Sequence, residues 1–151
     1  MKNRRTGIPA APARRAARRL LVQALYQRQL GGQRWQDLCA QYAEDPAFAR
    51  ADAEYFRAAL ESVCTGTAEL DELLGRHSDI TPARLDPVEH AILQLGLWEL
   101  TARPDIPYRV VIDEGVELAK CFGATEGHRY VNAVLDRASR ALRPVERGEV
   151  A

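Results

Sequence analysis

The sequence predicts an all-α protein of about seven helices, and three observations support this prediction. The eight prolines leave four long intervals in which helices can run uninterrupted: residues 13–45, 47–81, 88–103 and 108–143. β-Branched residues are sparse, and no segment alternates polar and apolar residues as a half-buried strand does. With 151 residues, of which 46% are hydrophobic, the chain can bury a core without a disulfide or a metal.

Four helices are expected in the first half of the chain, over about residues 13–30, 33–43, 45–66 and 67–76. Residues 1–12, which precede them, are typical of a flexible basic arm. Gly31 and Gly32 end the first helix, because glycine tolerates the left-handed backbone that follows a helix. Asp45 and Pro46 suit the start of the third helix, since aspartate caps and proline fits the first turn. A loop is expected over residues 77–86.

Three helices are expected in the second half, over about residues 87–101, 108–122 and 126–142. Apolar residues nearly encircle the first of these, so we expect it to be the central buried helix. The other two are amphipathic. The residues after Pro144 are polar and are expected to fray. The chain is thus divided into an arm (1–12), a helical domain (13–143) and a polar tail (144–151).

Several classes of protein are excluded by the composition. No run of about 18 apolar residues could span a membrane, and the N-terminus lacks the apolar run of a signal peptide. Cys39, Cys64 and Cys121 are odd in number and widely spaced, which is typical of reduced, partly buried thiols in a cytoplasmic protein. No catalytic, metal-binding or cofactor-binding motif is present. The sequence therefore predicts no enzyme, with no catalytic residue, metal or cofactor.

The charges of the chain are separated along the sequence although they sum to zero. Residues 1–36 carry nine positive charges and no carboxylate, whereas residues 37–151 carry twelve positive and 21 negative charges, a balance of −9. Such asymmetry favours an anionic partner at the basic end. The paired carboxylates Asp113 and Glu114 are interpreted as solvated charges near a helix start rather than as an acid–base pair.

The first helix carries the strongest functional signal. On a helical wheel of about 100° per residue, one arc of about 140° holds six polar or aromatic residues: Arg14, Arg15, Arg18, Arg19, Tyr26 and Gln29. Guanidinium groups bind phosphate, and an aromatic ring among them can stack on an unpaired base. We therefore expect this face to bind RNA, which we favour over an acidic protein. The alternative is a solvated basic face without a ligand.

A second candidate is the turn before the last helix, residues 123–130. Arg129 and Tyr130 repeat the basic and aromatic pairing at a helix N-terminus, where free N–H groups favour phosphate. The alternative is that Tyr130 belongs to the core, one turn before Val134.

Several runs of residues resemble the NusB family of bacterial transcription antitermination factors. In the first helix these are RRAARR (residues 14–19) and QALY (23–26). In the second half they are VEHAIL (88–93), WEL (98–100), RPDIPYRVVIDE (103–114), ELAK (117–120), FGA (122–124), HRYVN (128–132) and VLD (134–136). Their joint order and spacing, over about residues 13–143, carry the resemblance. The chain departs from the usual family pattern at Arg28, Asp113, Gly115, Thr125 and Gly127.

The resemblance implies seven helices in two small bundles and a protein that is not an enzyme. It implies binding of single-stranded boxA RNA together with NusE, a small-subunit ribosomal protein, in a complex of RNA polymerase with other Nus factors. This complex resists premature termination, chiefly on ribosomal RNA operons. The RNA site would comprise the first-helix face and Glu126, Arg129 and Tyr130, with Arg28 strengthening the attraction to RNA. Glu89 would contribute to the NusE surface.

Two alternative functions remain open from the sequence. A NusB-like domain also occurs at the N-terminus of ribosomal RNA 5-methylcytosine methyltransferases, although 151 residues leave no room for their cofactor-binding domain. The chain could otherwise be a helical interaction module, including a homodimer that hides the basic face. For the RNA-binding hypothesis, neutralising four or five phosphates predicts a log–log salt slope of about −3 to −4.

Overall fold

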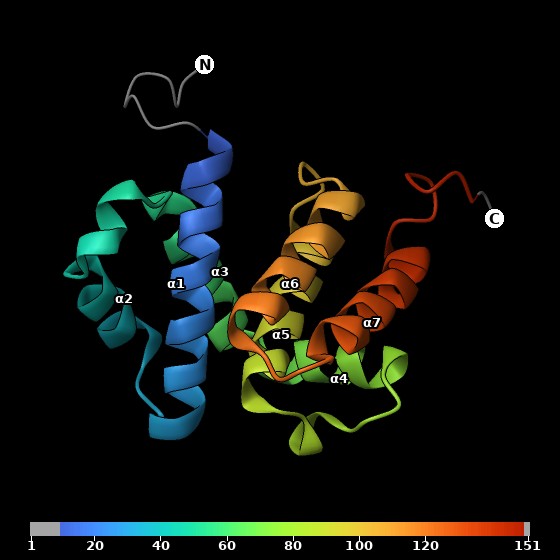
Figure 1. Ribbon diagram of the computed structural model, residues 1–151, viewed down its shortest axis with the longest axis horizontal. Coiled ribbons are helices and arrows are strands. Elements are labelled where there is room, and N and C mark those ends of the chain that lie inside the picture. Colours follow the sequence, from blue (N-terminus) through green and yellow to red (C-terminus); the bar gives the residue numbers. More distant parts are fainter. Residues whose placement is uncertain (1–9, 150–151) are drawn as a thin grey trace. The chain divides into compact units, whose positions relative to one another are not determined.

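The computed structural model describes residues 10–149, which form seven α-helices, two short 3₁₀ turns and, within that range, no strand (Figure 1). The all-α prediction is therefore confirmed. The helices form two compact units, of which the first ends at Thr65 and the second begins at Gly66. The two expected bundles are thus present. In the described range, no helix has the length and apolar character needed to cross a membrane.

The first unit contains α1 (Ala10–Gly31), α2 (Trp35–Ala43), η2 (Pro46–Arg50) and α3 (Ala53–Thr65). Helix α1, blue in Figure 1, packs beside both α2 and α3. Large side chains from all three helices are completely buried, and they form the core of this unit: Leu21, Leu38, Phe56 and Leu60. The apolar side of α1 is thus fixed against its neighbours, and this sets which of its polar residues face outward.

Two boundaries in the first unit differ from the predicted ones. Helix α1 begins at Ala10, because alanine favours helix and Pro12 falls in the first turn, where its missing N–H costs nothing. Residues 1–9 of the predicted arm lie outside the described residues. The predicted third helix is divided into η2 and α3. The side chain of Asp52 accepts a hydrogen bond of 3.0 Å from the amide of Tyr55, which caps α3 and separates it from η2.

The second unit contains α4 (Thr67–His77), η3 (Pro82–Arg84), α5 (Pro87–Ala102), α6 (Tyr108–Phe122) and α7 (Gly127–Leu142). Helix α5 packs against α4, α6 and α7, and residues 91–100 are all buried. The predicted central helix is therefore confirmed. Asp86 caps α5 by accepting hydrogen bonds from the amides of Val88 and Glu89, at 3.1 and 3.2 Å.

Two glycines allow α5, α6 and α7 to approach one another closely. A β-carbon at Gly96 or at Gly115 would lie 2.9 or 2.8 Å from a methyl group of Leu135. The Leu135 side chain on α7 therefore fills the space that these two positions leave empty. Gly115 is one of the departures from the family pattern, and this packing explains it.

The tail predicted to fray is instead held by hydrogen bonds in its described part. Arg143, at the end of α7, is buried and donates to the carbonyl oxygens of Glu99, Leu100, Arg103 and Ile106 at 2.9 to 3.1 Å. The carbonyls of Glu99 and Leu100 lie in the last turn of α5, and those of Arg103 and Ile106 lie in the segment that follows it. One planar group with five donors therefore joins the end of this helix to the segment after it. Glu146 accepts a hydrogen bond of 2.8 Å from the amide of Tyr108.

Candidate nucleic-acid interface

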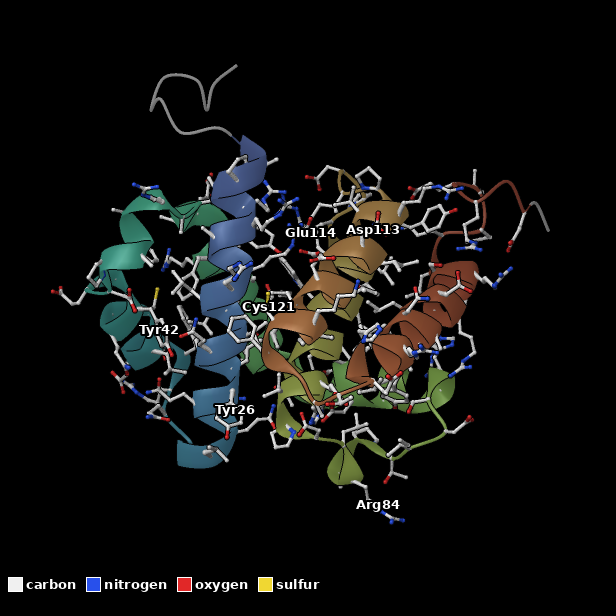
Figure 2. All side chains as sticks on the ribbon, in the orientation of Figure 1. Tyr26, Tyr42, Arg84, Asp113, Glu114 and Cys121 are labelled. Atoms are coloured by element: carbon white, nitrogen blue, oxygen red, sulfur yellow. The ribbon has the colours of Figure 1, made fainter. Side chains whose placement is uncertain are left out.

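The exposed side of α1 presents a stripe of basic and aromatic residues. Arg15, Arg19 and Tyr26 are all exposed, and their spacings of four and seven residues place them on one side of the helix. Tyr26, labelled in Figure 2 on the C-terminal half of α1, has an exposed fraction of 37%. Gln23, which lies between Arg19 and Tyr26 in the sequence, is exposed, and its side-chain amide donates to the carbonyl of Arg19 at 3.3 Å. We call Arg15, Arg19 and Tyr26 the α1 stripe.

The other two predicted arginines of this helix turn toward α3. The guanidinium carbon of Arg14 lies 4.6 Å from the ring centroid of Tyr55, and its Nε lies 3.5 Å from a carboxylate oxygen of Asp52. Arg18 lies 5.4 Å from the same ring centroid and is only 4% exposed. The structure therefore places Arg18 inside, whereas the helical wheel had placed it on the exposed face.

The helical wheel placed Arg18 on the exposed side because it did not include two apolar residues of α1. Val22 and Leu25 are both 2% exposed, and they lie on either side of Arg18 at about 80° and 20° on the wheel. The buried side of α1 is wider than expected, and the exposed side is correspondingly rotated toward Arg15 and Arg19. Gln29, the last predicted residue of this face, is exposed near the end of the helix.

Arg28 was expected to attract the RNA backbone, but it serves the fold. Its guanidinium donates at 3.3 Å to the carbonyl of Cys64, near the C-terminal end of α3. A cation is favourable there because the end of a helix carries a partial negative charge. Burial raises the pKa of the Cys64 thiol above its ordinary value, and the charge of Arg28 partly offsets this rise.

The turn before α7 keeps two of its three predicted RNA residues, Glu126 and Arg129, exposed. Arg129 is exposed and forms an ion pair of 2.5 Å with Glu126, whose backbone has the left-handed φ of 73°. The left-handed residue ends the turn, so that α7 begins at Gly127. Tyr130 is half-buried, and its hydroxyl is hydrogen-bonded to that of Ser78. The phenol therefore links α7 to the residues after α4.

Glu89, which was expected on a partner-binding surface, points into the second unit. It is 8% exposed, and its carboxylate lies against Gly123 and Gly127 in the turn between α6 and α7. Burial raises the pKa of Glu89, as does the nearby charge of Asp86, while a hydrogen bond from the backbone of Ala124 opposes the rise. The sequence signal that was missed is Gly127, whose missing side chain leaves this space.

The remaining polar clusters hold helices together. His90 and Gln94 on α5 both contact one carboxylate oxygen of Asp71 on α4, at 2.6 and 3.0 Å. Asp113, labelled with Glu114 in Figure 2, is exposed on α6. Among the residues that the structure describes, no three side chains of the metal-binding types come together.

The fold and the α1 stripe define a class of small, two-unit helical proteins with a surface suited to nucleic acid. The model of the NusB family matches residues 15–140 of the chain. This chain therefore belongs to the NusB family.

The chain is similar to known proteins over most of its length. It is 47% identical over 133 residues to the transcription antitermination protein NusB of Pseudomonas savastanoi pv. phaseolicola, covering 88% of this chain and 81% of that protein. It is 49% identical over 142 residues to the NusB protein of Alcanivorax borkumensis, covering 93% and 95%.

Solved structures of NusB proteins share this fold. NusB of T. maritima superimposes with a TM-score of 0.75 at 27% identity, covering 90% of this chain and 96% of that one. A chain in the crystal structure of antitermination factors NusB and NusE in complex with dsRNA gives a TM-score of 0.72 at 26% identity, covering 84% and 96%.

Proposed function

We propose that this chain is an RNA-binding transcription antitermination factor, and that the α1 stripe contacts the RNA. The exposure of Arg15, Arg19 and Tyr26 along one side of α1 is the observation that carries the proposal. One guanidinium group can donate two parallel hydrogen bonds to the oxygens of a phosphate, and it keeps its charge at any physiological pH. Tyr26, exposed on the same side of the helix seven residues beyond Arg19, offers a ring on which an unpaired base can stack.

The proposed RNA is single-stranded boxA RNA. A base must be unpaired before it can stack on Tyr26, and this favours a single strand. The related NusB structure holds dsRNA. Single-stranded and double-stranded forms of one sequence are therefore compared directly in the experiment below. Arg129, which is exposed beside Glu126, is a further proposed contact, with Glu126 and Tyr130 as its predicted neighbours in the site.

The proposed protein partner is NusE, which accompanies NusB in a related crystal structure. The family resemblance implies that NusE is a small-subunit ribosomal protein. The balance of −9 over residues 37–151 suits a basic protein of this kind. We further propose that the complex acts with RNA polymerase and other Nus factors, chiefly on ribosomal RNA operons, in the cytoplasm. No catalytic step is part of this proposal.

The proposal is tested by measuring RNA affinity with and without NusE. The ligands are a boxA-like single strand, the same sequence as a duplex, and a scrambled single strand. We expect tighter binding of the boxA-like single strand and a further gain when NusE is added. Solution mass is measured in parallel, since a homodimer that covers the α1 stripe would weaken binding as protein concentration rises.

The decisive variant is Arg15→Glu combined with Arg19→Glu. Its matched control is Arg50→Glu combined with Arg57→Glu, two exposed arginines of the same unit that lie outside α1. We expect only the first variant to abolish RNA binding, with both variants melting close to the wild type. Equal binding of scrambled RNA, no help from NusE, or equal loss in the control would contradict the proposed function.

A further inference from the structure

A pocket of about 260 Å³ lies in the second unit, where the start of α6, the C-terminal half of α7 and the residues after α7 meet. Its lining residues are Tyr108, Arg109, Ile112, Asp113, Asp136 and Arg147. Pockets for drug-sized ligands usually measure about 300 to 1,000 Å³. This pocket therefore suits a smaller molecule, and none of its residues belongs to the proposed RNA site.

The inner wall of the pocket is fixed by Arg147. Its guanidinium donates to a carboxylate oxygen of Asp136 at 3.2 Å and to the hydroxyl of Ser139 at 2.9 Å. The guanidinium carbon also lies 4.7 Å from the ring centroid of Tyr108, and the side chain of Arg147 is only 11% exposed. The amide of Tyr108 is in turn hydrogen-bonded to the carboxylate of Glu146. This wall is therefore ordered before a ligand arrives, which lowers the entropy cost of binding.

Two charged residues of the pocket have no ionic partner among the described residues. Arg109 and Asp113, the latter labelled in Figure 2, are exposed one turn apart on α6 and form no ion pair within residues 10–149. A basic residue that precedes an acidic one by four positions is the weaker order for pairing on a helix. The guanidinium carbon of Arg109 lies 5.3 Å from the ring centroid of Tyr108. The pocket thus presents one uncompensated cation and one uncompensated anion from this part of the chain.

These charges decide which kind of ligand the pocket accepts. A phosphate group would meet the carboxylates of Asp113 and Asp136, and a simple cation would meet the guanidinium groups of Arg109 and Arg147. Each of these ligands would therefore be placed beside like charges, which is unfavourable. A molecule with one positive and one negative group forms charge-assisted hydrogen bonds with both Asp113 and Arg109. The pocket therefore favours a zwitterion.

The spacing of Arg109 and Asp113 requires the two charges of the ligand to lie close together. Residues four positions apart on a helix have their β-carbons about 5 to 6 Å apart. A free α-amino acid carries its ammonium and carboxylate groups on one carbon atom, whereas a peptide separates them by at least one further residue. Ile112, which also lines the pocket, adds an apolar surface that suits an aliphatic side chain.

We propose that this pocket binds a free aliphatic α-amino acid, whose carboxylate is bound by Arg109 and whose ammonium group is bound by Asp113. This inference goes beyond the proposed RNA-binding function and does not depend on it. The bound ligand contacts α6, α7 and the residues after α7 together. It therefore stabilises the folded second unit.

The first experiment titrates the full chain with L-leucine, without RNA, and follows the backbone amide resonances by NMR. We expect saturable shifts at residues 108–113, 136 and 147. L-Leucinamide lacks the carboxylate and N-acetyl-L-leucine lacks the ammonium group, so each should bind about 10- to 100-fold more weakly, as expected for one lost hydrogen bond to a charged group. The dipeptide L-leucyl-L-leucine, which separates the two charges, should also bind more weakly. The absence of a saturable shift with L-leucine, or equal binding of any of the other three compounds, would overturn the inference.

The second experiment repeats the L-leucine titration with Arg109→Gln and with Asp113→Asn. Both residues are exposed, so we expect both variants to melt close to the wild type and to bind L-leucine about 10- to 100-fold more weakly. The matched controls are Glu117→Gln and Lys120→Gln, which remove charges of the same two signs from exposed positions of α6 outside the pocket. Wild-type affinity in the first two variants, or an equal loss in the controls, would overturn the inference.

The third experiment measures the melting temperature against L-leucine concentration. A ligand that binds only the folded protein raises this temperature as its concentration increases. We expect a rise in the wild type and a smaller rise in Asp113→Asn at the same concentration. An equal rise in both proteins would come from the solvent effect of the amino acid and would overturn the inference.

Discussion

Arg18 and Arg19 are neighbours in the sequence, and the structure predicts opposite consequences for replacing them. Arg18 is 4% exposed beside the ring of Tyr55, whereas Arg19 is exposed on the α1 stripe. Replacing Arg18 with alanine should destabilise the protein and leave its RNA contacts intact. Replacing Arg19 with alanine should leave stability intact and remove one phosphate contact.

The size of the Arg18 effect follows from what surrounds it. A largely desolvated guanidinium over an aromatic ring contributes about 2 kcal/mol. Removing the buried aliphatic stem costs more, at about 0.8 kcal/mol for each methylene, and release of the buried charge offsets part of this loss. The net loss is about 2 to 4 kcal/mol, which lowers the melting temperature by about 4 to 16 °C for a chain of this size. The exposed Arg19 should change stability by less than about 0.5 kcal/mol.

Thermal melts by circular dichroism measure the first effect, and salt titrations of RNA binding measure the second. Arg19→Ala should make the log–log slope shallower by about 0.7, while Arg18→Ala should keep the wild-type slope below its melting temperature. If Arg18→Ala melts like the wild type and loses one phosphate contact, the inward placement of Arg18 is wrong. If neither variant changes the slope, α1 does not contact RNA through Arg19.

Two further predictions concern the end of α7 and the turn that follows it. Arg143→Ala removes the buried guanidinium that donates to four backbone carbonyls at and after the end of α5, so we expect a loss of about 3 to 5 kcal/mol in chemical denaturation, while the exposed Arg140→Ala changes little. The amide of Tyr108, followed by Arg143, holds the pKa of Glu146 below its ordinary value of 4.5. Its stabilising effect is therefore present above about pH 4.5 and lost as the pH falls through the lower folded pKa, so that Glu146→Gln should lower the melting temperature at pH 7 and have little effect at pH 3. An equal effect at both values would exclude this origin of the stabilisation.

Helix boundaries could be predicted from the sequence wherever a local signal fixes them. Asp86 and Pro87 mark the start of α5, and Pro107 precedes the start of α6, because capping and proline geometry act within a few residues. The break between η2 and α3 could not be predicted in this way. Asp52 caps α3 locally, but its carboxylate also lies 3.5 Å from Arg14 and its amide donates to the carbonyl of Ala13, so its position depends on another helix.

The candidate site could be predicted only in part, for the same reason. Exposure of Arg15, Arg19 and Tyr26 follows from helical periodicity, which is a local property. The burial of Arg18 depends on Tyr55, which lies 37 positions further along the chain. The position of Glu89 depends on a glycine 38 positions away. Tertiary partners of this kind decide whether a polar residue of a helix binds a ligand or supports the fold.

The charge argument for an anionic partner changes once these contacts are known. Nine positive charges without a carboxylate over residues 1–36 had suggested an anionic partner, and four of these charges are the arginines at positions 14, 15, 18 and 19. Asp52 and the ring of Tyr55 now accompany Arg14, and Tyr55 also accompanies Arg18, so these two charges are stabilised within the first unit. Arg15 and Arg19 alone would contribute about −1.4 to the salt slope, at about −0.7 for each phosphate. A measured slope of −3 to −4 therefore requires other basic residues, Arg129 among them, whereas a slope near −1.4 would confine the RNA contact to the α1 stripe.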